Sequence, residues 1–208
     1  MQPIDLPEAT LELEPGFIPP GECEGLAAAI RREVPWETHV IRIFGREIAS
    51  PRLSCWIGDP DAAYVYSGTR FEPQPWTPTL DALRGRIEAA SGARYNSVLA
   101  NRYRDGRDSM GFHADDEPEL GPEPVIASLS LGAARRFVLK HRKRKRETFE
   151  LALGDGDLLV MRGATQRHWN HALPKTARPV GERINLTFRW IDASARAGSA
   201  RGYSKPLR

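Results

Sequence analysis

The sequence predicts a mainly β protein with flanking helices, an α+β chain whose core is a jelly roll. Two patterns support this fold class. The first 93 residues contain two segments of helical periodicity, and seven short segments of β character follow them, separated by turn residues. At 208 residues the chain is long enough to form one domain with a substantial hydrophobic core. We therefore expect helices to cover one face of a double sheet.

The composition narrows the class of protein. Hydrophobic residues make up 40% of the chain and charged residues 27%, which is ordinary for a globular protein. No run of eighteen apolar residues occurs, so we expect no membrane-spanning helix. The N-terminus lacks the basic and apolar regions of a secretory signal, and Cys23 and Cys55 indicate two reduced thiols. We expect a monomer in the bacterial cytosol, or in the nucleus of a eukaryote, and not a secreted protein.

The N-terminal part begins with an extended segment that leads into a helix. Residues 1–19 form the extended lead-in, and Pro19-Pro20 opens a helix from about Glu22 to Glu33. Pro35 ends this helix. A strand-like stretch at Thr38–Phe44 follows, and then a region rich in Pro, Gly and Asp that we expect to be a loop.

A second helix is expected before the β-rich part of the chain. Thr77 or Thr79 caps its N-terminus, and it continues to about Ala90. Ser91-Gly92 supplies the stop. Its apolar side chains recur at helical spacing, at Leu80, Leu83 and Ile87.

From residue 97 onward the pattern changes to short strands. The expected strands are Ser97–Arg104, Ile126–Leu131, Arg136–Lys140, Thr148–Leu153, Asp157–Met161, Trp169–Leu173 and Ile184–Trp190. Turns such as Gly121-Pro122 and Gly154-Asp155-Gly156 separate them. This succession of strands after two helices favours a double-sheet jelly roll.

A dense basic run stands out between two of the expected strands. Residues 140–146 contain six lysines and arginines with one histidine, so the rest of the chain is slightly acidic. Such a run is typical either of a solvated loop that aids solubility or of a surface that binds a polyanion such as nucleic acid. Its position between strands predicts an exposed hairpin tip, which favours binding.

A possible metal site begins with His113 and Asp115. On extended backbone, positions i and i+2 point to the same side, so both side chains can meet one ion. On its own this spacing is weak evidence for a metal site, because a single histidine is more often a hydrogen-bonded structural residue. His171, on a later strand, completes a set of two imidazoles and one carboxylate. Such a set leaves three positions of an octahedral iron(II) ion open, two for a 2-oxo acid and one for O₂.

A polar strand face near the C-terminus suits a dicarboxylate. Arg183 and Arg189 lie six residues apart on one expected strand and therefore face the same side. Paired arginines are often only surface ion pairs. Here, however, the apolar residues Ile184, Leu186 and Phe188 alternate with Asn185 and Thr187. A polar face inside a jelly roll would form a pocket in which guanidinium groups bind carboxylates.

Together these motifs resemble the AlkB family of iron(II)/2-oxoglutarate dioxygenases. The resemblance covers about residues 40–191 and is strongest to the branch that repairs alkylated DNA, including the enzyme that acts on duplex DNA. It is carried by the motifs Asn101-Arg102-Tyr103, His113-Ala114-Asp115-Asp116-Glu117, His168-Trp169-Asn170-His171 and Arg183-Ile184-Asn185-Leu186-Thr187-Phe188-Arg189.

The resemblance implies a division of the chain. Residues 1–93 would form an N-terminal extension, the helices and a nucleotide-recognition lid. Residues 94–192 would form the double-stranded β-helix (jelly-roll) core that binds Fe(II) and 2-oxoglutarate. Residues 193–208 would be a flexible tail, and the whole would be one structural domain.

The resemblance also implies roles in binding the co-substrate. His113, Asp115 and His171 would bind Fe(II). Arg183 with Tyr103 would bind the distal carboxylate of 2-oxoglutarate, while Arg189, helped by Asn101, would support the carboxylate nearest the metal. The expected pocket lining is Asn101, Tyr103, Arg183, Asn185, Thr187 and Arg189. With O₂, the enzyme would hydroxylate the methyl group of a base such as 1-methyladenine or 3-methylcytosine, releasing formaldehyde, succinate and CO₂.

Further residues would read the damaged base. The hairpin residues Phe44, Gly45 and Arg46 resemble an element in which Phe44 fills the gap left by a flipped base. From the residues alone, Phe44 is as readily an ordinary core residue. Tyr64 and Tyr66 resemble a lid segment, in which Tyr66 would stack the base against His113.

Charged residues would complete the recognition of alkylated DNA. Asp116 would contact the exocyclic amine or positive charge of the lesion, or would instead bond to a neighbouring turn. Lys143, Arg144, Lys145 and Arg146 would contact phosphates. Two alternatives are an RNA or tRNA demethylase or hydroxylase of the same family and a non-catalytic nucleic-acid-binding jelly roll.

Overall fold

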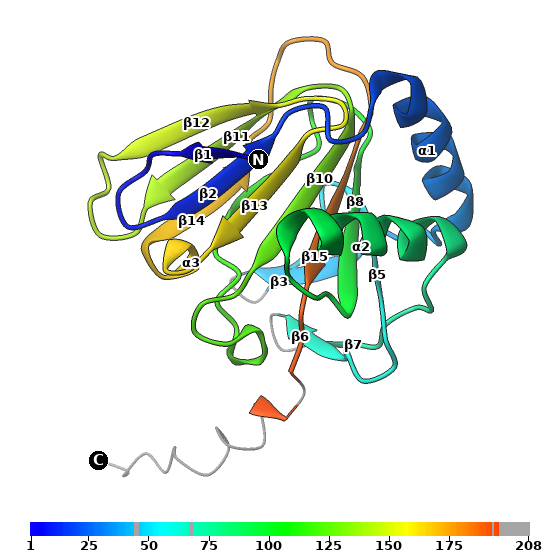
Figure 1. Ribbon diagram of the computed structural model, residues 1–208, viewed down its shortest axis with the longest axis horizontal. Helices are drawn as coiled ribbons and strands as arrows, with labels where there is room; N and C mark the ends of the chain where they lie inside the picture. Colours follow the sequence, from blue (N-terminus) through cyan, green and yellow to red (C-terminus); the bar gives the residue numbers. More distant parts are fainter. Residues whose placement is uncertain (44–45, 67–68, 193, 196–208) are drawn as a thin grey trace.

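Two antiparallel sheets and two long helices form the body of the protein (Figure 1). The computed structural model describes residues 1–43, 46–66, 69–192 and 194–195, and the side chains of residues 41–48 and 64–71 are outside this description. The larger sheet has the order β1 (Gln2–Ile4), β2 (Thr10–Glu14), β13 (Leu158–Arg162), β10 (Ile126–Gly132), β15 (Arg183–Arg189), β8 (Ser97–Tyr103), β5 (Leu53–Gly58).

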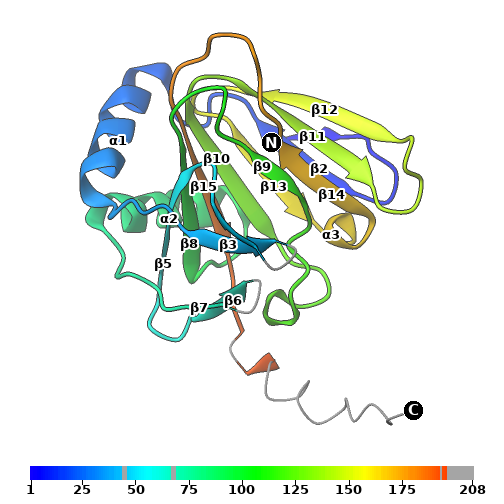
Figure 2. The ribbon, with the colours of Figure 1, turned by 180° about the vertical axis from the view of Figure 1, so that it is seen from behind.

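The smaller sheet faces the larger one, as Figure 2 shows from behind. Its order is β12 (Thr148–Leu153), β11 (Arg135–His141), β14 (Trp169–Leu173), β9 (Met110–His113). Two hairpins lie apart from both sheets, β3 (Val40–Ile43) with β4 (Arg46–Ala49) and β6 (Tyr64–Tyr66) with β7 (Thr69–Phe71). The predicted mainly β fold with a jelly-roll core is confirmed.

The two long helices have the ends that the sequence predicts. α1 (Pro20–Glu33) has a proline in its first turn and stops before Pro35. α2 (Pro78–Ser91) is capped by Thr77, whose hydroxyl accepts the N–H of Leu80 at 3.3 Å. Gly92 then takes a left-handed φ of +67°, which ends the helix at little steric cost. Two short helical turns also occur among the described residues, η1 (Pro118–Leu120) and α3 (Thr165–His168).

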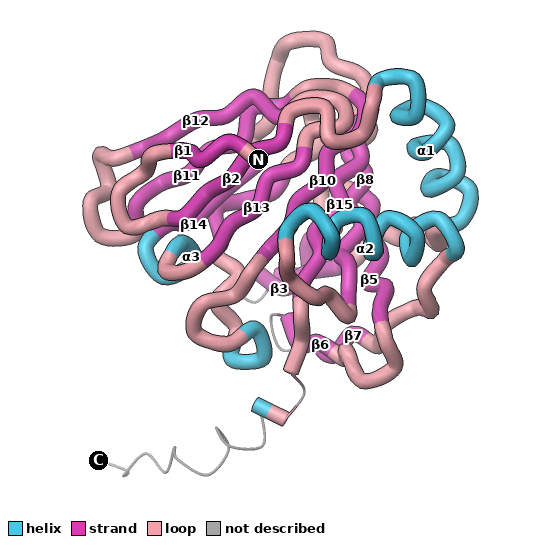
Figure 3. The backbone as a smooth tube through the Cα atoms, viewed as in Figure 1, coloured by secondary structure: helices cyan, strands magenta, loops and turns pink. Residues whose placement is uncertain are grey.

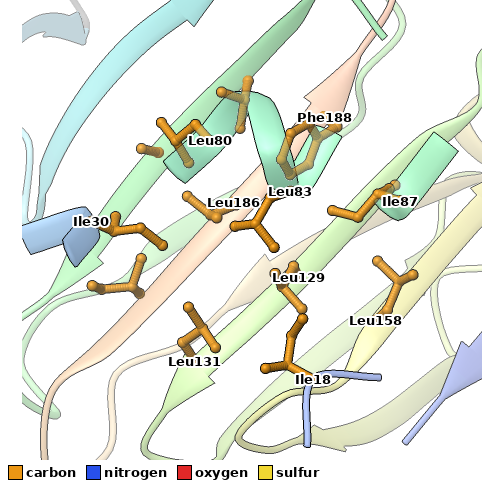
Figure 4. Close-up of a cluster of buried hydrophobic side chains, with 14 of the residues drawn as sticks. Ile18, Ile30, Leu80, Leu83, Ile87, Leu129, Leu131, Leu158, Leu186 and Phe188 are labelled. Carbon is orange, nitrogen blue, oxygen red and sulfur yellow. The ribbon is translucent and has the colours of Figure 1, made fainter. Parts of the chain in front are cut away.

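Both long helices cover the outer face of the larger sheet. Figure 3 shows the long helices α1 and α2 toward the right of the view, with α3 apart from them and strands through the rest of the body. Leu80, Leu83 and Ile87 of α2 pack with Leu186 and Phe188 of β15 in a buried cluster (Figure 4). Burial of each such side chain stabilises the fold by about 1.5–3 kcal/mol. None of the described helices is long and apolar enough to cross a membrane.

The alternation of β15 sorts its residues between two environments. Leu186 and Phe188 belong to the core under the helices, whereas Asn185, Thr187 and Arg189 line a cavity between the sheets. A second apolar cluster fills the space between the sheets beyond this cavity, and it includes Leu11, Leu139, Leu159, Met161 and Trp169. The polar residues of β15 therefore face a cavity that lies between the core under the helices and the second apolar cluster.

Two segments differ from the sequence-based expectation. The lead-in, expected only to be extended, forms β1 and β2, and β2 pairs with β13. The region after residue 44, expected to be a loop, contains the buried strand β5, which pairs with β8. The prediction failed because Pro51 and Asp59-Pro60 flank this short apolar run, and its pairing partners lie about 40 to 50 residues further along the chain. The division after residue 93 stays a prediction, although strands from both sides of it share the larger sheet.

Candidate metal centre

A cavity lies between the two sheets. One wall comes from β8, β10, β13 and β15 and the other from β9, β11 and β14, so residues far apart in sequence meet there. The lining residues are Leu99, Asn101, Tyr103, Met110, His113, Ser128, Phe137, Met161, His171, Ala172, Leu173, Arg183, Asn185, Thr187 and Arg189.

Two histidines face each other across neighbouring strands of the smaller sheet. His113, the last residue of β9, is the register partner of His171 on β14, and their ring centroids are 4.3 Å apart. Nδ1 of His113 lies 2.9 Å from the carbonyl oxygen of Gly111. A carbonyl can only accept a hydrogen bond, so this contact places the proton on Nδ1 and leaves Nε2 with its lone pair. That is the protonation state a metal ligand needs.

Asp115 joins the histidines from just beyond the end of β9. The strand ends at His113, so Asp115 lies outside the ladder of the smaller sheet. Oδ1 of Asp115 accepts a hydrogen bond from Nη2 of Arg189 at 2.7 Å, and its N–H donates to Oε1 of Gln166 at 3.0 Å. Oδ2 lies 3.8 Å from Nε2 of His171 and is buried without a hydrogen-bond partner among the described residues.

The electrostatics keep the carboxylate charged and the imidazole neutral. Burial on its own raises the pKa of the Asp115 carboxyl, but the charge of Arg189, with His171 and His113, lowers it to about 2. Burial lowers the pKa of His171 to about 3, and neighbouring His113 acts in the same direction. At neutral pH the site therefore offers one carboxylate and a neutral His171 imidazole.

This donor set fits an iron(II) ion. One ligand atom from each of His113, Asp115 and His171 lies within 4.8 Å of the others. The unsatisfied oxygen of Asp115 is a buried acceptor that a cation would satisfy. Two nitrogens and one carboxylate oxygen on one face of an ion match the ligand set of non-haem iron(II) oxygenases.

A buried cation without an anion lies elsewhere in the same cavity. Arg183 is only 2% exposed, donates from Nη2 to the hydroxyl of Ser130 at 2.8 Å, and sits 5.5 Å from the Tyr103 ring centroid. Burial lowers the pKa of its guanidinium to about 10, so it stays charged at neutral pH. No carboxylate pairs with Arg183 within the described part of the chain. An anionic ligand is the natural partner for this group.

The remaining polar residues of this face form a hydrogen-bonded row. Asn185 donates to the hydroxyl of Ser128 at 2.8 Å, and its side-chain oxygen accepts the hydroxyl of Thr187 at 3.1 Å. Asn101, the cross-strand partner of Asn185, accepts a hydrogen bond from Nε of Arg52 at 2.7 Å. The row holds these side chains in place along the cavity wall.

Comparisons with known proteins settle the family. The family model of the 2OG-Fe(II) oxygenase superfamily matches residues 10–189. The DNA oxidative demethylase ALKBH2 of Mus musculus is 40% identical over 180 residues, which cover 82% of this chain and 75% of that protein. The chain belongs to the AlkB family. Members of this superfamily use Fe(II), 2-oxoglutarate and O₂, so the chain is a dioxygenase.

Other relatives of this AlkB-family chain differ in length. The alpha-ketoglutarate-dependent dioxygenase alkB homolog 3 of Rattus norvegicus is 39% identical over 188 residues, 86% of this chain but only 63% of that protein. The solved structure of OsALKBH1 matches with a TM-score of 0.64 over 89% of this chain and 99% of that chain. At 17% identity this match shows a shared fold alone.

The residues expected to read the base are only partly described. Phe44 and Gly45 lie outside the described residues. Arg46 begins β4, and Tyr64 and Tyr66 bound β6, but the description does not extend to their side chains. Their assignment to the substrate stays a prediction.

Asp116 has a partner that the sequence did not indicate. Its carboxylate accepts a hydrogen bond from Nη1 of Arg142 at 2.6 Å, and the same nitrogen donates to the carbonyl of Gln166 at 3.1 Å. Asp116 therefore lies beside the metal-binding candidates and is held by the first residue of the basic loop. Its contact with a lesion stays a prediction.

The basic run forms a hairpin tip, but its cations are not equivalent. Residues 142–147 connect β11 to β12, while Lys140 and His141 belong to β11. Arg144 pairs with Glu8 at 2.5 Å and with Glu147 at 2.6 Å. By contrast, the exposed Lys143, Lys145 and Arg146 make no ion pair with any described residue. These three cations are open to a partner.

A second group of potential metal ligands lies at the base of this hairpin. Glu8, His141 and His168 also place one ligand atom each within 4.8 Å of the others. However, Nδ1 of His141 accepts the backbone N–H groups of Lys143 at 3.1 Å and Arg144 at 2.9 Å. The ring proton must then be on Nε2, which donates to Glu8 at 3.0 Å. This nitrogen has no lone pair for a metal, so the three residues form a hydrogen-bonded cluster and not a metal site.

Several residues of the cavity were missed by sequence reasoning. Ser128 and Ser130 alternate with apolar residues on β10, and the pattern that revealed the polar face of β15 would also have indicated them. No such signal marks Phe137 or Arg52. The ring centroid of Phe137 lies 5.4 Å from that of His171, and Arg52 donates to Asn101. Their neighbours come from distant parts of the chain.

Proposed function

We propose that this dioxygenase removes methyl groups oxidatively from alkylated bases in DNA, of the 1-methyladenine and 3-methylcytosine type. One observation carries the proposal: His113 and His171 line the same cavity as buried Arg183, and one ligand atom of each histidine lies within 4.8 Å of a carboxylate oxygen of Asp115, a donor set that fits iron(II). The similarity to proteins named DNA oxidative demethylase supports DNA as the substrate. The exposed cations at the hairpin tip support a polyanionic partner.

His113, Asp115 and His171 would hold the iron. The bound ion, with 2-oxoglutarate and O₂, supplies oxidation of the N-methyl C–H bond, while 2-oxoglutarate loses CO₂ and becomes succinate. The C–N bond of the hydroxymethylated base then breaks: its electron pair stays on the ring nitrogen, which becomes neutral in these cationic lesions, the hydroxyl proton passes to solvent, and formaldehyde leaves. The ligand residues thus fix where the oxidation takes place.

The co-substrate would be oriented by the polar cavity wall. Arg183 and Tyr103 would bind the distal carboxylate, because the Arg183 guanidinium is buried and pairs with no carboxylate of the described residues. Arg189 would support the carboxylate end near the metal indirectly, through its hydrogen bond to Asp115. Asn101, Asn185 and Thr187 would complete the wall.

The substrate base must leave the DNA double helix to reach a cavity between two sheets of the protein. We assign Phe44, Gly45 and Arg46 to the gap that the base leaves, and Tyr64 and Tyr66 to the flipped base itself. Asp116 would attract a positively charged lesion. Lys143, Arg144, Lys145 and Arg146 would serve the phosphates, with Arg144 also holding the loop through Glu8.

A panel of methylated oligonucleotides tests the proposal. The full chain, with Fe(II), 2-oxoglutarate and O₂, is incubated with 1-methyladenine or 3-methylcytosine in single-stranded DNA, duplex DNA and RNA. Mass spectrometry should show the unmodified base in DNA, with formaldehyde and succinate in equal amounts. A preference for RNA would support the alternative demethylase, and no product on any substrate would contradict the proposal. Size-exclusion chromatography of the same preparation tests the proposed monomer.

A further inference from the structure

Gln166 is a buried polar residue outside every motif that indicated the site. It lies in α3, the short turn between β13 and β14, and is 2% exposed. Its side-chain oxygen accepts the N–H of Asp115 at 3.0 Å, and its side-chain nitrogen lies 3.5 Å from the sulfur of Met161. Both polar atoms of the amide group therefore have partners in the interior.

The contact to Asp115 replaces one that the sheet does not provide. β9 ends at His113, so the N–H of Asp115 has no ladder partner on a neighbouring strand. A buried N–H without an acceptor is unfavourable, and Gln166 is the acceptor that allows the backbone to turn inward at this point. Arg189 then fixes Oδ1 of the same residue, which leaves Oδ2 for a metal.

The same residue connects three parts of the site. β14 begins three residues after Gln166 and carries His171. The main-chain carbonyl of Gln166 accepts Arg142, whose guanidinium also holds Asp116. The side chain of Gln166 thus attaches the Asp115 segment directly to the turn that leads into the strand of His171, and Arg142 bridges Asp116 to the Gln166 carbonyl.

We propose that Gln166 is a positioning residue for the metal-binding carboxylate. It touches no metal or substrate and acts by fixing the backbone of Asp115, so that the carboxylate meets the two imidazoles. The inference rests on the proposed role of His113, Asp115 and His171 as the iron site. Hydrogen-bonding partners of this kind typically change metal affinity about 10- to 100-fold when they are removed.

Metal affinity in the full chain tests this inference without turnover. Co(II), a spectroscopic substitute for Fe(II), is titrated into the protein and followed by its visible absorption. Gln166→Met keeps the side-chain length but lacks the acceptor, and Gln166→Asn keeps the amide but is too short to reach Asp115. Each should bind Co(II) at least about tenfold more weakly than the original chain. In either variant that folds, the amide proton of Asp115 should also exchange faster with solvent, measured before metal is added.

Thr165→Val is the matched control. Thr165 is the neighbouring buried residue of α3, and its hydroxyl accepts the N–H of Thr10 and donates to the carbonyl of Arg162, away from the metal-binding candidates. It should bind Co(II) within about twofold of the original chain even if its thermal unfolding midpoint falls as far as that of Gln166→Met. An equal loss of affinity in Thr165→Val, or unchanged affinity in both Gln166 variants, would overturn the positioning role.

A different result would point to the underlying assignment. If Asp115→Ala bound Co(II) as tightly as the original chain, the metal site itself would be wrong. If Asp115→Ala lost Co(II) binding while both Gln166 variants retained it, the metal site would stand and only the role of Gln166 would fail.

Discussion

Two groups of two histidines and one carboxylate lie among the described residues, and only one of these two groups suits a metal. In each group the ligand atoms lie within 4.8 Å of one another. His113 places its proton toward the carbonyl of Gly111, which leaves Nε2 as a ligand, whereas His141 accepts two backbone N–H groups and must donate from Nε2 to Glu8. The hydrogen-bond partner of the second ring nitrogen, and not the set of residue types, therefore decides whether a histidine cluster can bind a metal.

The carboxylates of the two groups differ in the same way. Oδ2 of Asp115 is buried without a hydrogen-bond partner among the residues described, while Oε2 of Glu8 accepts both His141 and Arg144. An acceptor that is already satisfied gains little from a cation, and a buried unsatisfied one gains much.

The largest expected effect comes from removing a ligand of the first group. His113→Ala or Asp115→Ala should lower formaldehyde release by more than about 100-fold, because loss of a ligand should cost at least as much as loss of an outer partner. Release is measured on a methylated oligonucleotide with saturating 2-oxoglutarate. His168→Ala, in the second group, serves as the control and should retain turnover. If the two groups gave equal losses, the distinction between them would fail.

The next effect concerns the cations beside the two groups, since Arg183 lacks a carboxylate and Arg144 has two. Arg183→Met should raise the KM for 2-oxoglutarate about 10- to 100-fold, because a hydrogen bond to a charged group contributes about 1.5–3 kcal/mol. Steady-state kinetics at varied 2-oxoglutarate measure the change.

Arg102→Met is the matched control for Arg183. Arg102 lies on β8 opposite Ile184, on the far side of the sheet from the cavity, and pairs with Glu182 at 2.5 Å. Its replacement should leave the KM for 2-oxoglutarate unchanged. An unchanged KM in Arg183→Met would place the co-substrate carboxylate elsewhere.

A smaller effect is expected on DNA binding, where the unpaired cations of the hairpin tip should matter more than Arg144, which is paired. Replacing Lys143, Lys145 and Arg146 with Ala should weaken duplex DNA binding and reduce the slope of log affinity against log salt concentration by about 2–3. Arg144→Ala should reduce it by less than about one, since this guanidinium is already paired with Glu8 and Glu147. Fluorescence anisotropy at several salt concentrations gives both slopes. Equal slopes in the original chain and the triple variant would remove the tip from the DNA interface.

The smallest effect tests the second group through pH. Hydrogen bonds from Arg144 and then His141 lower the pKa of the Glu8 carboxyl, so its charged form is favoured in the folded protein. This contribution is present at neutral pH and is lost as acidification protonates Glu8. Glu8→Gln should therefore lower the thermal unfolding midpoint slightly at pH 7, and the difference should shrink toward pH 3. Co(II) affinity should stay unchanged; a lower affinity would mean that Glu8 binds metal after all.

Sequence periodicity predicted the parts of the site that lie on one strand. The alternation from Arg183 to Arg189 placed two arginines on one face, and the structure lines the cavity with both. The helix ends at Pro20 and Gly92 also followed from local chemistry. The strand β5 did not, because its burial depends on pairing with β8.

By itself, then, the sequence determined which residue types were available, which of them alternate along a strand, and where the long helices begin and end. These properties depend on neighbours within a few positions. Only the tertiary structure decided that Asp115 leaves its strand to meet Gln166, 51 residues away, and Arg189, 74 residues away. It also decided which nitrogen of His113 and of His141 holds the proton, because hydrogen-bond partners in space set that choice.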